Sequence, residues 1–457
     1  MKFRKETEFQ ETEIGKIPRD WRTFSLKEAF ELYKGTTPST KDSKYWGGTI
    51  PFATPTDITA INDLNMIYLT KTEKYLTEEG IRSKNLRIVP RGSLLFTSRA
   101  TIGYLAINNV DVTINQGVIA LIPKRKDVNI LYYYYYLLGM RKKFEELAGG
   151  STYREISMAM FSKTVIPQPP LQEQNRIANI LSTIDRAIEL YHGERERLER
   201  LKRGLMSELL TGRIRVREEN GRLSFYRETE LQETEIGEIP RDWKVVEFGV
   251  LFDFQRGLSY RKNDISTFQT PIRFITINDL EKEGGRKRDV EPIYLSEELE
   301  DSIINKKCTV EMGDILIAIT DMSKGFIIGA PLYIDETLRN QGETLVYSMD
   351  LVKLLPKRSL NTKFYFYLLS WERVRKIMKS LARGTNVLHL DLNLTKKLKV
   401  IEPPLEEQGR IANILSTIDR TIELHHRGRE RLERLKRGLM DLLLTGKVRV
   451  VDGDVGS

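Results

Sequence analysis

Apolar residues recur at every seventh position in two distant stretches of the chain. The first stretch has Ile177, Ile184, Tyr191, Leu198 and Leu205, and the second has Ile411, Ile418, His425, Leu432 and Leu439, with one histidine among them. A second stripe follows the first at Ile180/Leu181, Ile188, Leu201 and Leu209. This spacing predicts two long helices, each with a narrow coiled-coil seam.

Each predicted helix has sequence signals at both of its ends. Proline pairs precede the helices at Pro169–Pro170 and Pro403–Pro404, and Thr211–Gly212 and Thr445–Gly446 follow them. About 40 residues per helix correspond to roughly 60 Å. Because a lone apolar stripe must be buried, we expect the two helices to form an antiparallel coiled coil. The alternative is that each helix packs on its own globular domain.

The two helical stretches are nearly the same sequence. From Pro169 and from Pro403, 32 of 38 positions are identical, and ETEIGKIPRDW at Glu11 matches ETEIGEIPRDW at Glu233. The chain is therefore a tandem repeat. The inserts between these matched frames, residues 22–168 and 244–402, share far less sequence. A duplicated frame with two different inserts suggests one device that reads two different things.

Both inserts alternate between strand-like and helical patterns in the same order. Strands are expected at GSLLFTSRATIGYLAI (from Gly92) and GVIALIP (from Gly117), and a helix is expected at LYYYYYLLGMRKKFEELAG (from Leu131). In the second insert we assign the same places to GDILIAIT, ETLVYSM and KFYFYLLSWERVRKIMKSLARG. An α+β domain with a curved sheet is the expected class. The five tyrosines at 132–136 resemble a stacking platform, but on a helix they would point in all directions, which favours core packing.

Several short matches inside the inserts carry polar side chains at turn-like positions. Lys34–Gly35 corresponds to Arg256–Gly257, and we align Asn115–Gly117 with Asn340–Gly342. Asn and Gln can read adenine, whereas Arg and Lys can bind guanine or phosphate. The alternative is that Asn-Gln-Gly only forms a turn and that the matched Asp57 and Asp279 only cap helices. The candidate DNA contacts are Lys34, Thr36, Ser98, Arg99, Asn115, Gln116, Arg256, Ser259, Lys324, Asn340 and Gln341.

Charge and cysteine content narrow the functional classes. The net charge of +9 and the pI of about 9.2 are compatible with a nucleic-acid partner. A single cysteine, Cys308, excludes an intramolecular disulfide and a multi-thiolate zinc site. A reducing cytoplasm is therefore the expected location. The first ten residues lack the apolar stretch of a signal peptide, and no apolar run is long enough to span a membrane.

The sequence offers no catalytic centre. It has no glycine-rich phosphate loop, and its four histidines, two of them adjacent at His425–His426, do not have metal-ligand spacing. The proline pairs follow Gln168 and Glu402 and precede leucine, so they lack the aromatic residue of the Asn/Asp-Pro-Pro-Tyr/Phe motif of amino-methyltransferases. We interpret them as helix starts and expect no metal and no cofactor in this chain.

The order ETEIG-x-IP-x-x-W, variable insert, PPL-x-EQ-x-RIA-x-IL-x-x-ID and long helix, repeated once, resembles the DNA-specificity subunit of type I restriction–modification enzymes. The resemblance covers essentially the whole chain. It implies two target recognition domains that each read half of a split DNA target, and an antiparallel coiled coil that spaces them. It also implies two methyltransferase subunits and restriction/translocase subunits as partners. S-adenosylmethionine, ATP and magnesium would belong to those partners.

The expected architecture is a pseudo-twofold tandem repeat with two recognition domains and two spacer helices. The expected parts are recognition domain 1 (1–168), helix 1 (169–212), recognition domain 2 (213–402), helix 2 (403–446) and a tail (447–457). Because the two inserts differ, we expect the DNA target to be asymmetric as well as split. Two rival interpretations are a coiled-coil scaffold that binds no DNA and an enzyme whose site the sequence does not reveal.

Overall fold

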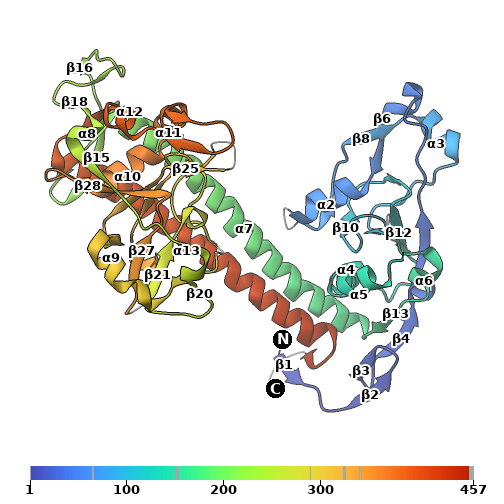
Figure 1. Ribbon diagram of the computed structural model, residues 1–457. Coiled ribbons are helices and arrows are strands. Elements are labelled where there is room, and N and C mark those ends of the chain that lie inside the picture. Colours follow the sequence, from blue (N-terminus) through green and yellow to red (C-terminus); the bar gives the residue numbers. More distant parts are fainter. Residues whose placement is uncertain are drawn as a thin grey trace. The chain divides into compact units, whose positions relative to one another are not determined.

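The computed structural model describes residues 2–63, 66–149, 154–288, 290–322, 326–338, 340 and 342–451 (Figure 1). The chain divides into two compact units. The first unit comprises Met1–Glu196 with Leu424–Ser457, and the second comprises Arg197–Glu423. The two long helices, α7 (Leu171–Leu209) and α13 (Leu405–Leu444), each contribute residues to both units.

Within each unit, α7 and α13 run antiparallel. In the first unit the Tyr191 ring packs 5.4 Å from the His425 ring, and Asp185 forms a 2.6 Å ion pair with Lys436. In the second unit Lys202 forms a 2.7 Å ion pair with Asp419. Partners on α13 fall in number as those on α7 rise, which confirms the predicted antiparallel coiled coil.

The outer parts of both helices also belong to the cores of the globular domains. Ile177 and Leu181 join the first core together with Leu443, and Ile411 and Leu209 join the second. The helix ends therefore pack on the globular domains, as the alternative interpretation proposed. Between these ends, the helices pack on each other along the seam. The predicted second stripe is wrong at Leu201, which is 50% exposed.

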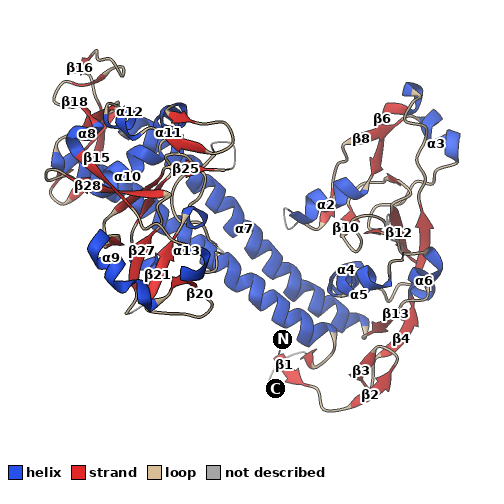
Figure 2. Ribbon diagram, in the orientation of Figure 1, coloured by secondary structure: helices blue, strands red, loops and turns tan. Residues whose placement is uncertain are grey.

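The first unit is built from two main sheets. A five-stranded sheet has the order β5-β12-β9-β10-β7, and a three-stranded sheet has the order β11-β6-β8. Figure 2 labels β10 and β12 of the first sheet and β6 and β8 of the second. These strands are β5 (Phe30–Lys34), β6 (Trp46–Ala53), β7 (Tyr68–Leu69), β8 (Lys74–Leu76), β9 (Leu94–Thr97), β10 (Leu105–Asn108), β11 (Thr113–Ile114) and β12 (Val118–Pro123). The helices are α1 (Leu26–Ala29), α2 (Pro55–Asp63), α3 (Glu78–Lys84), α4 (Ile130–Gly139), α5 (Arg141–Leu147) and α6 (Met158–Ser162), with the short 3-10 turn η1 (Ser43–Tyr45).

The central strands of the first unit read as unbroken apolar runs because both of their faces are buried. In β9, Leu94 and Phe96 enter the core that contains α4, whereas Leu95 enters a separate core on the other face. In β12, Ile119 enters the core that contains α4, and Val118 enters the core on the other face. A side-chain period of two therefore produces a continuous apolar sequence when each face has its own core.

The five consecutive tyrosines lie on α4, as the sequence predicts. Tyr132, Tyr133 and Tyr135 are fully buried, and Tyr134 is 4% exposed. The Asn129 side chain accepts a hydrogen bond from the backbone N–H of Tyr132 and caps the helix. Burial raises the pKa of all five phenols. The tyrosines form a core and do not offer a stacking surface.

The second unit repeats this plan with a third small sheet. Its sheets have the orders β19-β28-β24-β26, β20-β22-β21-β27-β23 and β25-β30-β29. These strands are β19 (Phe252–Arg256), β20 (Ile265–Ser266), β21 (Ile272–Ile275), β22 (Ile293–Leu295), β23 (Thr309–Val310), β24 (Ile315–Ala318), β25 (Thr320–Asp321), β26 (Pro331–Tyr333), β27 (Thr344–Tyr347), β28 (Leu351–Pro356), β29 (Ala382–Arg383) and β30 (Leu388–Leu390). The helices are α8 (Phe248–Leu251), α9 (Glu300–Lys306), α10 (Thr362–Ser370), α11 (Glu372–Ser380) and α12 (Leu392–Lys396), with 3-10 turns η2 (Lys262–Asp264), η3 (Ile277–Asp279), η4 (Glu297–Leu299) and η5 (Glu336–Leu338).

Paired strands close each unit around the matched frames. The first unit has β2 (Phe9–Thr12) on β3 (Gly15–Pro18) and β4 (Arg22–Ser25) on β13 (Val165–Gln168), and the second has β16 (Leu231–Gln232) on β17 (Ile239–Pro240) and β18 (Lys244–Glu247) on β31 (Lys399–Glu402). The strand after α7, β14 (Ile214–Glu219), turns back as β15 (Arg222–Arg227). The strand after α13, β32 (Val448–Val451), pairs in the same register with β1 (Lys2–Lys5). Part of the segment expected as a tail is thus a strand.

Among the described residues, no helix is long and apolar enough to cross a membrane.

Candidate nucleic-acid interface

One end of the five-stranded sheet gathers most of the predicted contacts of the first unit. Lys34 ends β5, Thr97 ends β9 and Val118 begins β12, and the strand pairings place these three positions at the same sheet end. The backbone N–H of Ser98 donates to the carbonyl of Gly117, which joins two of the loops. The sequence therefore predicted residues that cluster in space.

The Lys34 and Gln116 side chains contact other side chains of the protein. The Lys34 ammonium forms an ion pair with Glu155, and each side chain is 33% exposed. Gln116 is exposed, and its amide oxygen accepts a hydrogen bond from the Thr37 hydroxyl. Thr36 is also exposed, and Arg99 is partly exposed. These four side chains reach the surface at the sheet end, where a ligand could meet them.

Two other predicted contacts have structural roles. The Asn115 side chain accepts a 2.9 Å hydrogen bond from the backbone N–H of Gly117, so the expected turn is present. Ser98 is fully buried, and its hydroxyl has no hydrogen-bond partner among the described residues. Buried in this way, Ser98 has no surface with which to reach DNA, so the structure does not support its proposed role.

The matched glycines explain why Lys34–Gly35 and Arg256–Gly257 recur. A Cβ atom at Gly35 would overlap the backbone carbonyl of Ile114, and one at Gly257 would overlap that of Ser348. Only glycine permits this close approach of two loops. The basic residue before each glycine is therefore held at the sheet end in both units.

The second unit forms the same sheet end with different side chains. Arg256 ends β19, Ala318 ends β24 and Leu351 begins β28, in the same pairing pattern as the first unit. Arg256 and Ser259 are exposed, as expected for candidate contacts. Thr320 and Met349 take the places that Arg99 and Gln116 have in the first unit, so the same backbone presents different side chains.

The structure corrects one alignment between the inserts. GVIALIP forms β12, which pairs with β5 and β9, and its counterpart β28 is the LVKLLP segment, which pairs with β19 and β24. ETLVYSM lies mainly in β27, which pairs in parallel with β21 as β11 pairs with β6. The alignment of Asn115–Gly117 with Asn340–Gly342 is therefore wrong, since residues 348–350 occupy that place. The match of Asn-Gln-Gly between the inserts is accidental, and the strand order gives the correct correspondence.

Asn340 consequently lies away from the sheet end, before the start of β27. Its amide donates a 2.8 Å hydrogen bond to Glu343, and its backbone N–H donates to the same carboxylate. Lys324 and Gln341 lie outside the described residues. Of the five candidates in the second unit, Arg256 and Ser259 are those that the structure places at the sheet end.

The matched aspartates behave as caps. The Asp57 carboxylate accepts a 2.9 Å hydrogen bond from the backbone N–H of Thr54, and that of Asp279 accepts a 2.8 Å bond from Thr276. Burial raises the pKa of Asp279 even though these hydrogen bonds oppose the change. Their recurrence is explained by local structure.

A duplicated ion cluster anchors each matched frame and was not foreseen from the sequence. In the first unit, Arg449 lies 2.6 Å from Glu6, 2.8 Å from Asp20 and 2.7 Å from Glu173. Trp21 donates from its indole nitrogen to Glu173. The equivalent cluster in the second unit contains Arg215, Glu228, Asp242, Glu407 and Trp243. The shared letters of PRDW and PPL-x-EQ therefore have a structural role.

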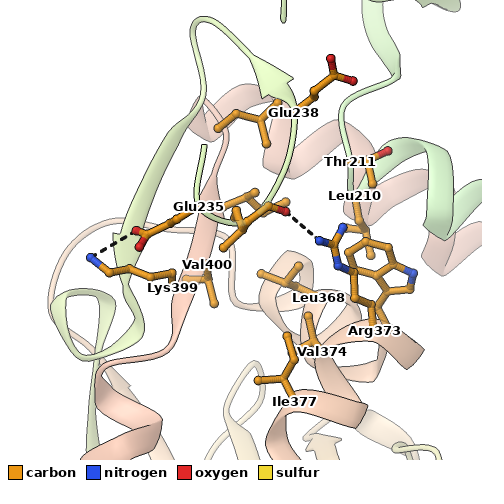
Figure 3. Close-up of a pocket in the computed structure, with 14 residues that line it drawn as sticks. Leu210, Thr211, Glu235, Glu238, Leu368, Arg373, Val374, Ile377, Lys399 and Val400 are labelled. Atoms are coloured by element: carbon orange, nitrogen blue, oxygen red, sulfur yellow. Dashed lines mark hydrogen bonds and ion pairs between the residues drawn. The ribbon is translucent and has the colours of Figure 1, made fainter. Parts of the chain in front are cut away.

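A cavity of about 180 Å³ lies beside the ETEIG segment of the second unit (Figure 3). Val374 and Ile377 of α11 line it together with Val400 of β31. Arg373 donates a 2.8 Å hydrogen bond to the Ile236 carbonyl at its rim. The polar lining includes Thr211 and Glu238, and Lys399 forms a 3.5 Å ion pair with Glu235. Among the described residues no group of three His, Cys, Asp or Glu could hold a metal ion.

The sequence matches the type I restriction modification DNA specificity domain at residues 18–200 and 240–434, more than half of the 457 residues. The MjaIX specificity subunit of Methanocaldococcus jannaschii is 36% identical over 283 residues, which are 62% of this chain and 63% of that protein. The MjaVIII specificity subunit of the same organism is 25% identical over 98% of both chains.

Solved structures show the same architecture. The S subunit of a type I restriction–modification system from M. genitalium superposes with a TM-score of 0.56 at 15% identity, over 93% of this chain and 96% of that chain. At this identity the likeness concerns the fold. With the sequence match, it establishes that the chain belongs to the DNA specificity family of type I restriction–modification systems, whose members are non-catalytic subunits of a multisubunit complex.

Proposed function

We propose that the sheet end of each unit reads one half of a split, asymmetric DNA target. The observation that carries the proposal is that equivalent strand ends present different side chains in the two units. Lys34, Arg99 and Gln116 surround this place in the first unit, and Arg256 and Ser259 do so in the second. Different surfaces on one fold suit different half-sites.

The chemistry at each sheet end fits double-stranded DNA. Lysine and arginine side chains bind phosphates and fix the register, while amide and hydroxyl groups read base edges. The net charge of +9 adds a sequence-independent attraction for the duplex. Recognition would therefore combine a salt-dependent component with a small set of base contacts.

The helices α7 and α13 are proposed to set the spacing of the half-sites and to bind two methyltransferase subunits. Large apolar residues are exposed at matched helix positions: Leu190 is 70% and Leu424 66% exposed, and Leu201 is 50% and Leu435 49% exposed. Neither the seam nor a core accounts for these side chains. Their recurrence fits two copies of one partner. The restriction/translocase subunits would join the same complex, and S-adenosylmethionine, ATP and magnesium would be bound by the partners.

A scaffold that binds no DNA is the competing proposal, and salt dependence separates the two. If the chain reads DNA, the affinity of its methyltransferase complex for the target duplex should fall steeply as salt rises, because phosphate contacts release counterions. A scaffold would show no such slope.

The decisive test is selection from random duplexes by the chain in complex with its methyltransferase subunits. We expect two unequal sequence blocks separated by unspecified bases. A continuous or a symmetric selected motif would contradict the proposal.

A further inference from the structure

One position at each sheet end is absent from the candidate contacts that the sequence predicted. Glu155 and His389 each stand 14 residues before a proline pair. After Glu155, the backbone N–H of Ile156 donates a 3.0 Å hydrogen bond to the carbonyl of Ser98, which directly follows β9. After His389, the backbone N–H of Leu390 donates a 2.8 Å hydrogen bond to the carbonyl of Ile319, which directly follows β24. Glu155 and His389 therefore occupy the same place in the two units.

The neighbours of this place differ between the units. The backbone of Glu155 forms isolated antiparallel β-bridges, with Arg99 on one side and with Gly149 on the other. His389 pairs with Thr320 of β25 and with Arg383 of β29. Side chains of paired residues point to the same face of a sheet. Glu155 thus shares its face with Arg99 and is ion-paired to Lys34, whereas His389 shares its face with a threonine and an arginine.

Stability alone does not explain the choice of side chain here. A partly exposed ion pair such as Lys34–Glu155 contributes little to folding. The exposed imidazole of His389 fits the same backbone without a carboxylate. The frame therefore tolerates different chemistry at this position, as a position that sets specificity must.

We propose that Glu155 and His389 are specificity-determining residues that each contact a base in one half of the DNA target, an inference that rests on the proposed function. The major groove of DNA admits paired β-strands, and β29 and β30 form the edge pair of the three-stranded sheet β25-β30-β29. A carboxylate only accepts hydrogen bonds, so Glu155 suits the amino group of cytosine or adenine. Lys34 holds this carboxylate in place and offsets its repulsion from phosphates.

His389 suits a different base. Its Nδ1 atom lies 3.5 Å from the Thr320 hydroxyl oxygen. If Nδ1 accepts from this hydroxyl, Nε2 is the ring atom that donates a hydrogen bond. Guanine presents two acceptors, N7 and O6, in the major groove. The first half-site should therefore contain a critical amino-bearing base, and the second a critical guanine.

Selection from duplexes randomised in both halves, by the methyltransferase complex, tests this assignment. Glu155→Gln keeps the shape of the side chain and adds a donor, so it should change the preference at one position of one half by roughly tenfold or more. His389→Glu should shift one position of the other half from guanine toward an amino-bearing base. Glu31→Gln is the matched control. Glu31 forms an ion pair with Arg87 at the end of β5 opposite to Lys34, so this substitution should leave the preferences in both halves unchanged.

Three results would overturn the assignment. Unchanged preferences in both variants, with a lower melting temperature, would make these residues structural only. An equal loss of affinity for every sequence would assign them to phosphate binding or to folding. If the unaltered complex selects no split target, the proposed function fails together with this inference, whereas the first two results leave it standing.

Discussion

At the scale of single residues, two buried arginines show what the repeated sequence is for. Arg449 and Arg215 each join a strand, the PRDW segment and the start of a long helix through three carboxylates. The sequence shows that these letters recur, but the partners are up to 443 positions apart. No local pattern could have assigned them to one another.

Removing one arginine should be costly because it leaves buried carboxylates without their counter-ion. Arg215→Leu is expected to lower the free energy of unfolding by about 3 kcal/mol. Arg217→Leu is the control, because Arg217 pairs with Glu219 on an exposed surface and should cost less than about 1 kcal/mol. Urea unfolding of both variants measures the difference. Equal losses would show that the cluster is not an anchor.

The same cluster should make the first unit sensitive to acid. Burial alone would raise the pKa of Glu6, but hydrogen bonds from the Glu8 backbone and from Arg449 lower it from 4.5 to about 2. Because the folded state prefers the carboxylate, its contribution is present above pH 4.5 and is lost as the pH falls toward 2.

Unfolding of Glu6→Gln measured across this pH range tests that contribution. The stability deficit of the variant should be largest above pH 4.5 and should shrink below it. The exposed neighbour substitution Glu8→Gln is the control and should change stability little at any pH. A deficit that does not depend on pH would show that Glu6 acts through packing and not through its charge.

At the scale of elements, the long helices were the easiest parts to predict, and the strands of the two inserts were the hardest. Heptad spacing and proline pairs located α7 and α13 within a few residues, because a seam must repeat along its whole length. The strand order of the second insert was misassigned at β27 and β28, because buried strands share one apolar pattern. Pairing partners, which the pattern does not encode, distinguish such strands.

Two helical glycines should respond in opposite ways to the same substitution. A Cβ atom at Gly428 would lie 2.6 Å from the Tyr191 ring in the seam, whereas Gly193 has no neighbour within 4 Å. Gly193→Ala should raise the free energy of unfolding by up to about 1 kcal/mol through helix propensity. Gly428→Ala should lower it by about 1–2 kcal/mol through overpacking. Thermal or urea unfolding compares them, and a gain in both would contradict the seam geometry.

At the scale of the whole molecule, the repeat separates constant parts from variable parts. The frames carry the ion clusters and the seam, which need the same residues twice, while the two sheet ends differ. The separation into constant frames and variable inserts could be predicted from the sequence, as could several residues of the first sheet end. The sequence did not reveal Glu155 or His389, because their position is defined only by strand pairing.

The helices are proposed to determine the distance between the half-sites. Inserting seven residues into each helix preserves the heptad and adds about 10 Å to each rod. The preferred spacer should lengthen by roughly three base pairs, at about 3.4 Å per pair. Selection of duplexes with variable spacers measures this, with a seven-residue insertion in a surface loop as the control. An unchanged spacer would refute the ruler role of the helices.

The most direct test of the account maps methylated adenines genome-wide in cells that express the chain with its methyltransferase subunits. The map is made twice, once with the natural chain and once with residues 22–168 replaced by the insert of another specificity subunit. We predict a split, asymmetric motif in which the replacement changes one half and leaves the other half and the spacer as they were. A continuous motif, or a replacement that alters both halves, would contradict the claim that each unit reads its own half of the target.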